Sequence, residues 1–215
     1  MTNKIKFFLD DETVEALEGD SIWSVAKRYG TTLPHLCYAD KPGYRADGNC
    51  RACMVSIEGE RVLAASCIRK PSEGMKVYTN DERSKKSRQM VLELLVTDQP
   101  KKSNAHDPES HFWKMAEKVE ISKSRFDKKL QKTIPTSDNS NKAMSVNLDA
   151  CIHCNLCVRA CREVQVNDVI GMGMRGPTSK VIFDFDDPMG DSTCVSCGEC
   201  VQACPTGALM ESSML

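Results

Sequence analysis

Cys151-Ile-His-Cys-Asn-Leu-Cys-Val-Arg-Ala-Cys161 and Cys194-Val-Ser-Cys-Gly-Glu-Cys-Val-Gln-Ala-Cys204 are the two stretches that decide how this 215-residue chain folds. They share every cysteine position and both end in Cys-Val-x-Ala-Cys, so they form an internal repeat. Each is a C-x2-C-x2-C-x3-C run, a spacing that holds [4Fe–4S] clusters in pairs. The short x2 loops let three thiolates converge on one cluster, while the fourth cysteine, on a following helix, points to the other cluster.

This crossed arrangement predicts two ligand sets. The first [4Fe–4S] cluster is expected on Cys151, Cys154, Cys157 and Cys204, and the second on Cys194, Cys197, Cys200 and Cys161. Pro205 completes the bacterial ferredoxin signature after the second run, whereas Arg162 stands at that position after the first. Two structural zinc sites are the alternative, but zinc sites use separated C-x2-C pairs rather than tight triplets followed by a fourth cysteine.

Four more cysteines stand in the N-terminal third of the chain, at Cys37, Cys50, Cys53 and Cys67. Their central C-x2-C pair suits a [2Fe–2S] cluster of plant type, but the first spacing is x12 where that type has x4. Gly43 and Gly48 lie in this longer loop and would allow it to wrap tightly, bringing backbone N–H groups toward the sulfurs. The set predicts one [2Fe–2S] cluster, with zinc as the alternative.

The composition limits the class of protein. Twelve cysteines in a chain without an apolar stretch long enough to span a bilayer or serve as a signal peptide predict a cytoplasmic protein with no membrane span, in which grouped cysteines bind metal. The formal net charge of −1 gives no indication of nucleic-acid binding. Only 6% of the residues are aromatic, so the apolar cores should be small and metal-stabilised.

The predicted fold class is α+β, with an N-terminal β-grasp [2Fe–2S] ferredoxin domain over residues 1–79. A hairpin is expected from Lys4–Leu9 and Thr13–Leu17, followed by a helix that begins after Ser21 and ends before Gly30. Later strands are expected within Ala52–Ile57 and Lys76–Tyr78. This order of elements is that of a β-grasp ferredoxin.

Residues 80–143 are predicted to form a helical connector with a polar linker, and residues 144–215 a bacterial-type 2[4Fe–4S] ferredoxin domain. One connector helix should begin at Asn80 and a second at Asp107-Pro108. Their expected apolar faces are Met90, Val91, Leu94 and Leu95 in the first helix, and Phe112, Met115, Ala116 and Val119 in the second. The basic run Lys123–Lys132 is interpreted as a solvated helix face, or else a docking site for an acidic partner, and Thr136–Lys142 as the linker.

Three segments carry a family resemblance: Pro34-His-Leu-Cys37, Asp47-Gly-Asn-Cys-Arg-Ala-Cys-Met54 and Ala65-Ser-Cys67. They resemble the N-terminal [2Fe–2S] domain of the large iron–sulfur subunit of respiratory NADH dehydrogenase. Related proteins are hydrogenase diaphorase subunits, iron-only hydrogenases and NAD-dependent molybdenum or tungsten formate dehydrogenases. Together with Cys67-Ile-Arg-Lys-Pro71 and Cys200–Leu209, the residues Gly48–Met54 most resemble the N-terminal region of the formate dehydrogenase catalytic subunit.

Two departures from the family refine this interpretation. The NADH dehydrogenase and diaphorase members carry an H-x3-C-x2-C-x5-C motif between the two domains, whereas Thr97–His111 contains no cysteine. That difference favours the formate dehydrogenase branch. The sequence ends 11 residues after Cys204, where the family's catalytic subunit continues into a molybdopterin domain, so we expect an electron-transfer subunit or a fragment without a substrate site.

The resemblance implies a relay that passes electrons between a molybdopterin or tungstopterin catalytic subunit and an NAD-linked flavoprotein (diaphorase) subunit, and that has no catalytic residues of its own. A hydrogenase or NADH dehydrogenase-like complex is the alternative. An iron–sulfur redox sensor is an alternative of a different class, but a sensor needs one labile cluster rather than three. The substrate, the direction of flow and the acceptor (NAD, NADP or ferredoxin) stay open.

A few histidines and carboxylates need a separate interpretation. His106, Asp107, Glu109 and His111 could be drawn as a metal site, but the polar first turn of a helix explains the same residues. His35 and His153 stand beside cluster cysteines, where they would either tune a cluster or simply pack. Gly171–Gly176 partly matches a dinucleotide-binding glycine pattern without its strand–loop–helix context, so we expect no nucleotide site there.

Overall fold

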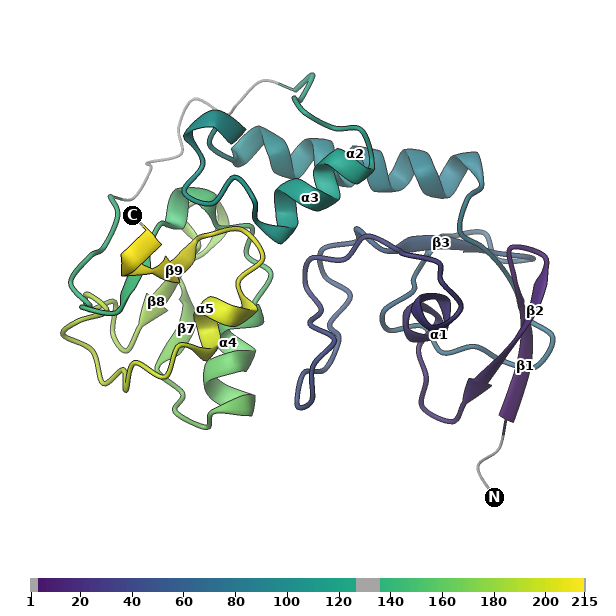
Figure 1. Ribbon diagram of the computed structural model, residues 1–215, viewed down its shortest axis with the longest axis horizontal. Coiled ribbons are helices and arrows are strands. Elements are labelled where there is room, and N and C mark those ends of the chain that lie inside the picture. The colour runs from purple at the N-terminus through teal and green to yellow at the C-terminus, as the bar shows by residue number, and fades with distance from the viewer. Residues whose placement is uncertain (1–3, 127–135, 215) are drawn as a thin grey trace.

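The computed structural model describes residues 4–126 and 136–214. It is a mixed α/β structure, with a five-stranded sheet domain at the N-terminus and a domain of two-stranded sheets and short helices at the C-terminus (Figure 1). Helices α2 (Glu82–Asp98) and α3 (His111–Lys118) run above both domains and link them.

The N-terminal sheet has five strands in the order β2-β1-β5-β3-β4. These are β1 (Lys4–Leu9), β2 (Glu12–Leu17), β3 (Met54–Ile57), β4 (Ala64–Ala65) and β5 (Lys76–Tyr78). Strands β1 and β2 form the predicted hairpin, with Lys4 opposite Leu17, and β5 runs parallel to β1 and antiparallel to β3. The hairpin turn at Asp10 and Asp11 has φ values of 49° and 71°, which short polar side chains tolerate best.

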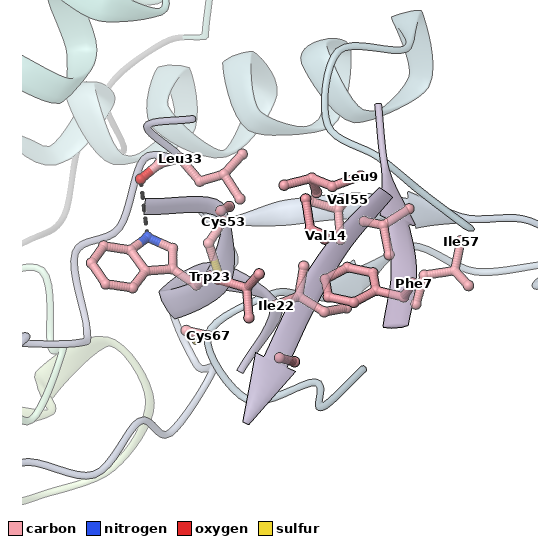
Figure 2. Close-up of a cluster of buried hydrophobic side chains, with 14 of the residues drawn as sticks. Phe7, Leu9, Val14, Ile22, Trp23, Leu33, Cys53, Val55, Ile57 and Cys67 are labelled. Atoms are coloured by element: carbon pink, nitrogen blue, oxygen red, sulfur yellow. Dashed lines mark hydrogen bonds between the residues drawn. The ribbon is translucent and has the colours of Figure 1, made fainter. Parts of the chain in front are cut away.

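Helix α1 (Ile22–Arg28) packs its apolar side on this sheet. Ser21 and Ser24 cap the helix reciprocally, and Gly30, with φ of +85°, follows the C-cap as predicted. Figure 2 shows how the core continues from Phe7 and Val14 to Cys53 and Cys67, both almost fully buried. The indole N–H of Trp23 donates to the carbonyl of Leu33 at 3.2 Å, which fixes the segment leading to the first cysteine.

Helix α2 begins one residue later than predicted, because Asp81 rather than Asn80 caps it. Its predicted apolar face is only partly buried: Leu95 packs against the core, but Leu94 is 49% exposed. The buried residues of the helix are Ser84, Arg88, Leu92, Glu93 and Val96. The physical reason lies in Arg88, whose guanidinium donates to the carbonyls of Met54 at 2.9 Å and Thr79 at 2.6 Å. These two bonds hold Arg88 on the buried side of the helix, at the expense of the more apolar face.

Helix α3 also begins later than predicted. Asp107 accepts the N–H of Glu109 and closes a turn of its own, and the helix starts at His111 after Ser110. Its fully buried residues are Phe112, Trp113 and Ala116, while Met115 and Val119 are partly buried. They pack with Leu92 and Val96 of α2 and with Leu36 and Ala52, which flank the N-terminal cysteines.

The C-terminal domain has two small two-stranded antiparallel sheets and two short helices. Strand β6 (Met144–Val146) pairs with β9 (Leu209–Glu211), and β7 (Ile170–Gly173) pairs with β8 (Lys180–Phe183). Helix α4 (Leu156–Arg159) continues as a π-helical turn over Ala160–Val164, and α5 (Glu199–Ala203) occupies the same place in the second repeat. Short 3-10 turns lie at Lys102–Asn104, Leu148–Ala150, Gly176–Thr178 and Ser212–Met214.

The polar run Thr136–Lys142 is bonded to the C-terminal domain rather than forming a free linker. Asp138 exchanges two backbone hydrogen bonds of 2.9 Å with Val146, and its carboxylate accepts the N–H of Met189 at 2.7 Å. Asp and Ser side chains in the run thus satisfy nearby backbone groups, an ordering that composition does not reveal. Most of the basic run Lys123–Lys132 lies outside the described residues.

No helix among residues 4–126 and 136–214 is long and apolar enough to cross a membrane.

Candidate metal centres

The four N-terminal cysteines meet at the edge of the sheet domain. Cys37, Cys53 and Cys67 are buried and Cys50 is partly exposed. The sulfur of Cys37 is hydrogen-bonded to Cys50 and Cys67, and that of Cys53 to Cys67, so the four side chains form one continuous group.

Crowding these four thiols perturbs their acidity. Hydrogen bonds from Cys50 and Cys67 lower the pKa of Cys37 to about 2, and a hydrogen bond from Cys67 lowers the pKa of Cys53 to about 7. The same contact with Cys37 raises the pKa of Cys50 and of Cys67 well above the usual range of a thiol. The four groups cannot all ionise without a positive partner, and thiolate-binding metal centres supply that partner.

The loop between Cys37 and Cys50 wraps as its glycines predicted. Gly43 and Gly48 have φ of +85° and +64°, and a Cβ on Gly48 would meet Ile68 Cδ1 at 2.8 Å. The wrap directs the backbone N–H groups of Asn49 and Cys50 to the sulfur of Cys37, the latter at 3.5 Å. Such N–H···S contacts stabilise thiolate charge, which is needed at an iron–sulfur centre.

The first predicted [4Fe–4S] set lies together in the C-terminal domain. A small cavity is lined by Cys151, Cys154, Cys157 and Cys204. Backbone N–H groups face two of the sulfurs: His153 donates to Cys151, and Leu209 donates to Cys204, both at 3.4 Å.

The second predicted set lines a separate small cavity. Its sulfurs come from Cys161, Cys194, Cys197 and Cys200. Val169 N–H donates to Cys161 at 3.3 Å and Ser196 N–H to Cys194 at 3.4 Å. The crossed grouping of the cysteines is therefore present in the structure, with the fourth cysteine of each run facing the other run's cavity.

The two repeats also share a backbone signature that sequence reasoning missed. The second residue after the first cysteine has φ of 54° at His153 and 55° at Ser196. The fourth residue has φ of 61° at Asn155 and 78° at Gly198. These left-handed residues aim successive N–H groups inward, and the Asn and Gly at equivalent positions were the signal for them.

Burial makes three of the cavity cysteines poor acids on their own. It raises the pKa of Cys154 and Cys157 far above the usual thiol range, and that of Cys200 to about 12. Cysteines gathered around two small cavities, with Cys157, Cys161 and Cys200 buried, fit thiolate coordination of a cationic centre, which would reverse these shifts.

The two domains touch through the loop between Cys37 and Cys50. Tyr44 donates to Glu199 at 2.8 Å and Arg45 pairs with Glu163 at 3.0 Å. Asn49 donates to the carbonyl of Cys154 at 3.4 Å. The unusual length of this loop is readable in the sequence, whereas its use as the domain contact is not.

The histidines and acids of the connector do not converge on one point. His106 Nε2 lies 3.0 Å from Asp149, whereas His111 Nε2 donates to the carbonyl of His35 at 2.7 Å. His35 packs between Trp23 and His111, and burial lowers its pKa to about 4. These contacts support packing roles for His35 and His111.

Within residues 4–126 and 136–214, no three His, Cys, Asp or Glu side chains form a group sized for one metal ion. A single zinc ion would hold its thiolates at about 2.3 Å. In an iron–sulfur cluster the thiolates bind different iron atoms and stand farther apart than around one zinc ion.

Two known protein families match separate parts of the chain. Residues 2–82 match a 2Fe-2S iron-sulfur cluster binding domain, and residues 150–208 match a 4Fe-4S dicluster domain.

Whole-chain relatives come from several kinds of oxidoreductase. The NADP-reducing hydrogenase subunit HndD of Solidesulfovibrio fructosivorans is 34% identical over 94% of this chain and 35% of its own length. An NADH-quinone oxidoreductase subunit of Rhizobium meliloti is 30% identical over 96% of this chain and 24% of its own. A Staphylococcus haemolyticus protein named as a formate dehydrogenase, SH0748, is 30% identical over 91% of this chain and 20% of its own.

The chain thus spans about a third or less of these relatives. A chain of an NAD⁺-reducing [NiFe]-hydrogenase, solved in the H₂-reduced state, shares the fold with a TM-score of 0.86 and 25% identity, over 97% of this chain and 88% of that one.

Proposed function

We propose that this chain, which carries a 2Fe-2S iron-sulfur cluster binding domain followed by a 4Fe-4S dicluster domain, relays electrons inside a larger oxidoreductase. The observation that carries the proposal is the gathering of all twelve cysteines into three separate groups of four, in two domains that touch. Bound clusters, one [2Fe–2S] and two [4Fe–4S], would supply one-electron transfer at each group.

Each ligand set is assigned from the cysteines that the fold brings together. Cys37, Cys50, Cys53 and Cys67 would hold the [2Fe–2S] cluster in a β-grasp domain. Their side chains form one continuous group, which would supply the four thiolates that such a cluster needs. The [4Fe–4S] clusters would be held by Cys151, Cys154, Cys157 and Cys204, and by Cys161, Cys194, Cys197 and Cys200.

The protein's own residues prepare these sites for electron transfer. Backbone N–H groups of Val169 and Leu209 offset thiolate charge, and part of each ligand set is buried away from water. A sensor cluster must be easily lost, whereas Cys37 and Cys53 are 0% exposed. Burial of this kind supports a relay over a redox sensor.

For the parent complex we propose a formate dehydrogenase-like assembly in the cytoplasm, with a molybdopterin or tungstopterin catalytic subunit and an NAD-linked flavoprotein. The absence of cysteine from Thr97–His111 and the 30% identity to SH0748 support this choice. The alternative is a hydrogenase complex, which the 34% identity to HndD and the shared fold with the [NiFe]-hydrogenase chain favour.

Purification from native cells under mild conditions would distinguish the two complexes. Stoichiometric molybdenum or tungsten with formate-dependent reduction of the chain's clusters supports the formate dehydrogenase-like complex. Copurifying nickel, or hydrogen-dependent reduction of the clusters without molybdenum or tungsten, would instead support the hydrogenase complex.

Within either complex we propose a fixed order of contacts. Cys197 is exposed at the second cavity, so the C-terminal domain is suited to face the catalytic subunit, and the N-terminal domain to face the flavoprotein. Cross-linking of the intact complex should join residues 144–214 mainly to the catalytic subunit. Cross-links from residues 4–78 to that subunit instead would reverse the order.

A further inference from the structure

Arg159 is a buried cation placed among all three cysteine groups. It ends helix α4, between Cys157, which lines the first cavity, and Cys161, which lines the second. Only 2% of the residue is exposed. Because a guanidinium stays charged under all conditions in which proteins fold, this position carries a permanent positive charge.

The guanidinium reaches across the domain contact to the [2Fe–2S] ligand loop. One terminal nitrogen donates to the carbonyl of Cys37 at 2.6 Å, and the other forms an ion pair with Asp47. A residue of the C-terminal domain therefore touches the main chain of one N-terminal cysteine directly.

Solvent does little to screen this charge. Asp47 is shared with Arg45, which also pairs with Glu163, so one carboxylate serves two guanidinium groups. The Nε of Arg159 is buried without a hydrogen-bond partner among the described residues. Burying a charge with incomplete compensation is costly, and such groups are found where the charge itself has a function.

Resting on the proposed relay function, we propose that Arg159 is a positioning residue whose buried charge raises the reduction potential of the [2Fe–2S] centre and couples that centre to the C-terminal domain. Reduction adds one negative charge to a cluster, so a nearby buried cation favours the reduced form. The one electron gained there passes on without a proton, because the guanidinium keeps its own proton throughout. Loss of the charge should lower the potential.

Substitutions at Arg159 and Asp47 change the local charge in opposite directions. Arg159→Gln removes the cation, Arg159→Lys keeps it, and Asp47→Asn removes the paired anion. Arg162→Gln is the matched control, because Arg162 is three residues further along, lies beside Cys161 and has a side chain that is 55% exposed. Its charge is screened by water, so its loss should change little.

The test is an EPR-monitored redox titration of the full-length, cluster-loaded chain and these variants, after iron analysis of each. Arg159→Gln should make the [2Fe–2S] centre about tenfold harder to reduce, which is about 59 mV lower for one electron. Arg159→Lys and Arg162→Gln should stay near the wild-type potential, and Asp47→Asn should shift it upward. If Arg159→Gln loses its clusters, the other two variants test the inference: the [2Fe–2S] potential should rise in Asp47→Asn and stay near the wild-type value in Arg159→Lys.

If the role of Arg159 is purely structural, the [2Fe–2S] potential should move in the same direction in Arg159→Gln and Asp47→Asn, or by the same amount in Arg159→Gln and Arg159→Lys. Either result overturns the inference. Unshifted potentials in variants that keep three clusters overturn it while leaving the relay function intact. A wild-type chain without a [2Fe–2S] signal would overturn both.

Discussion

Replacing Cys161 by Ser should remove the cluster of the second run, although Cys161 belongs by sequence to the first run. The structure places Cys161 in the cavity of Cys194, Cys197 and Cys200. Serine keeps a hydrogen-bond acceptor for the N–H of Val169, which now lies 3.3 Å from the sulfur, so packing and backbone contacts should largely persist. The loss should be about four of about ten iron atoms per chain, counting one [2Fe–2S] and two [4Fe–4S] clusters.

Cys204→Ser is the mirror control, because Cys204 lies in the other cavity and serine would keep an acceptor for Leu209 N–H. Iron and sulfide analysis give the size of the loss, and the EPR spectrum of the reduced protein identifies the remaining clusters. Cys161→Ser should give the residual spectrum of Cys197→Ser, and Cys204→Ser that of Cys154→Ser. The crossed assignment is refuted if Cys161→Ser matches Cys154→Ser.

Three further predictions concern the structure around these centres. Phe112→Ala should lower the free energy of unfolding by about 3–5 kcal/mol, because residue 112 is 0% exposed. Phe126→Ala is the control and should change it little, because residue 126 is 41% exposed. Equal effects of the two variants in denaturant titrations would contradict the helix packing. Gly48 has a φ of +64°, and a Cβ there would lie 2.8 Å from Ile68 Cδ1. Gly48→Ala should therefore lower the free energy of unfolding by about 1–2 kcal/mol and speed the loss of [2Fe–2S] absorbance on warming. An unchanged rate would show that the loop has another conformation. Burial lowers the pKa of His111, so near and below pH 6.5 the unfolded chain binds more protons than the folded chain. The free energy of unfolding should therefore fall as the pH drops from 7 to 5.5. This pH dependence should be weaker in His111→Gln, and an equal pH dependence would assign it to other groups.

The cysteine groups could be predicted because their information is local. Two-residue spacings force neighbouring thiolates together, and the repeat shows which fourth cysteine must cross over. The hairpin Lys4–Leu9 with its Asp10-Asp11 turn, and the capped helix after Ser21, were equally readable, since alternation, turn chemistry and capping act within a few residues.

The remaining features depend on partners that are distant in sequence. Hydrophobic periodicity placed Leu94 in the core, but bonds to the backbone carbonyls of Met54 and Thr79 hold Arg88 on the buried side of helix α2. The run beginning at Thr136 reads as a linker until Val146 is found beside it.

The contact of Arg159 with Cys37 joins residues 122 positions apart, and only the unexplained length of the loop between Cys37 and Cys50 indicated that something binds there. No pattern within either segment names the other as its partner.

The central claim, that the twelve cysteines hold three iron–sulfur clusters, is tested most directly by metal and sulfide analysis of the full-length chain purified without oxygen. The account predicts a brown protein with about ten iron and about ten sulfide atoms per chain and visible absorption that bleaches on reduction. Near-stoichiometric zinc in a colourless protein without sulfide would contradict it.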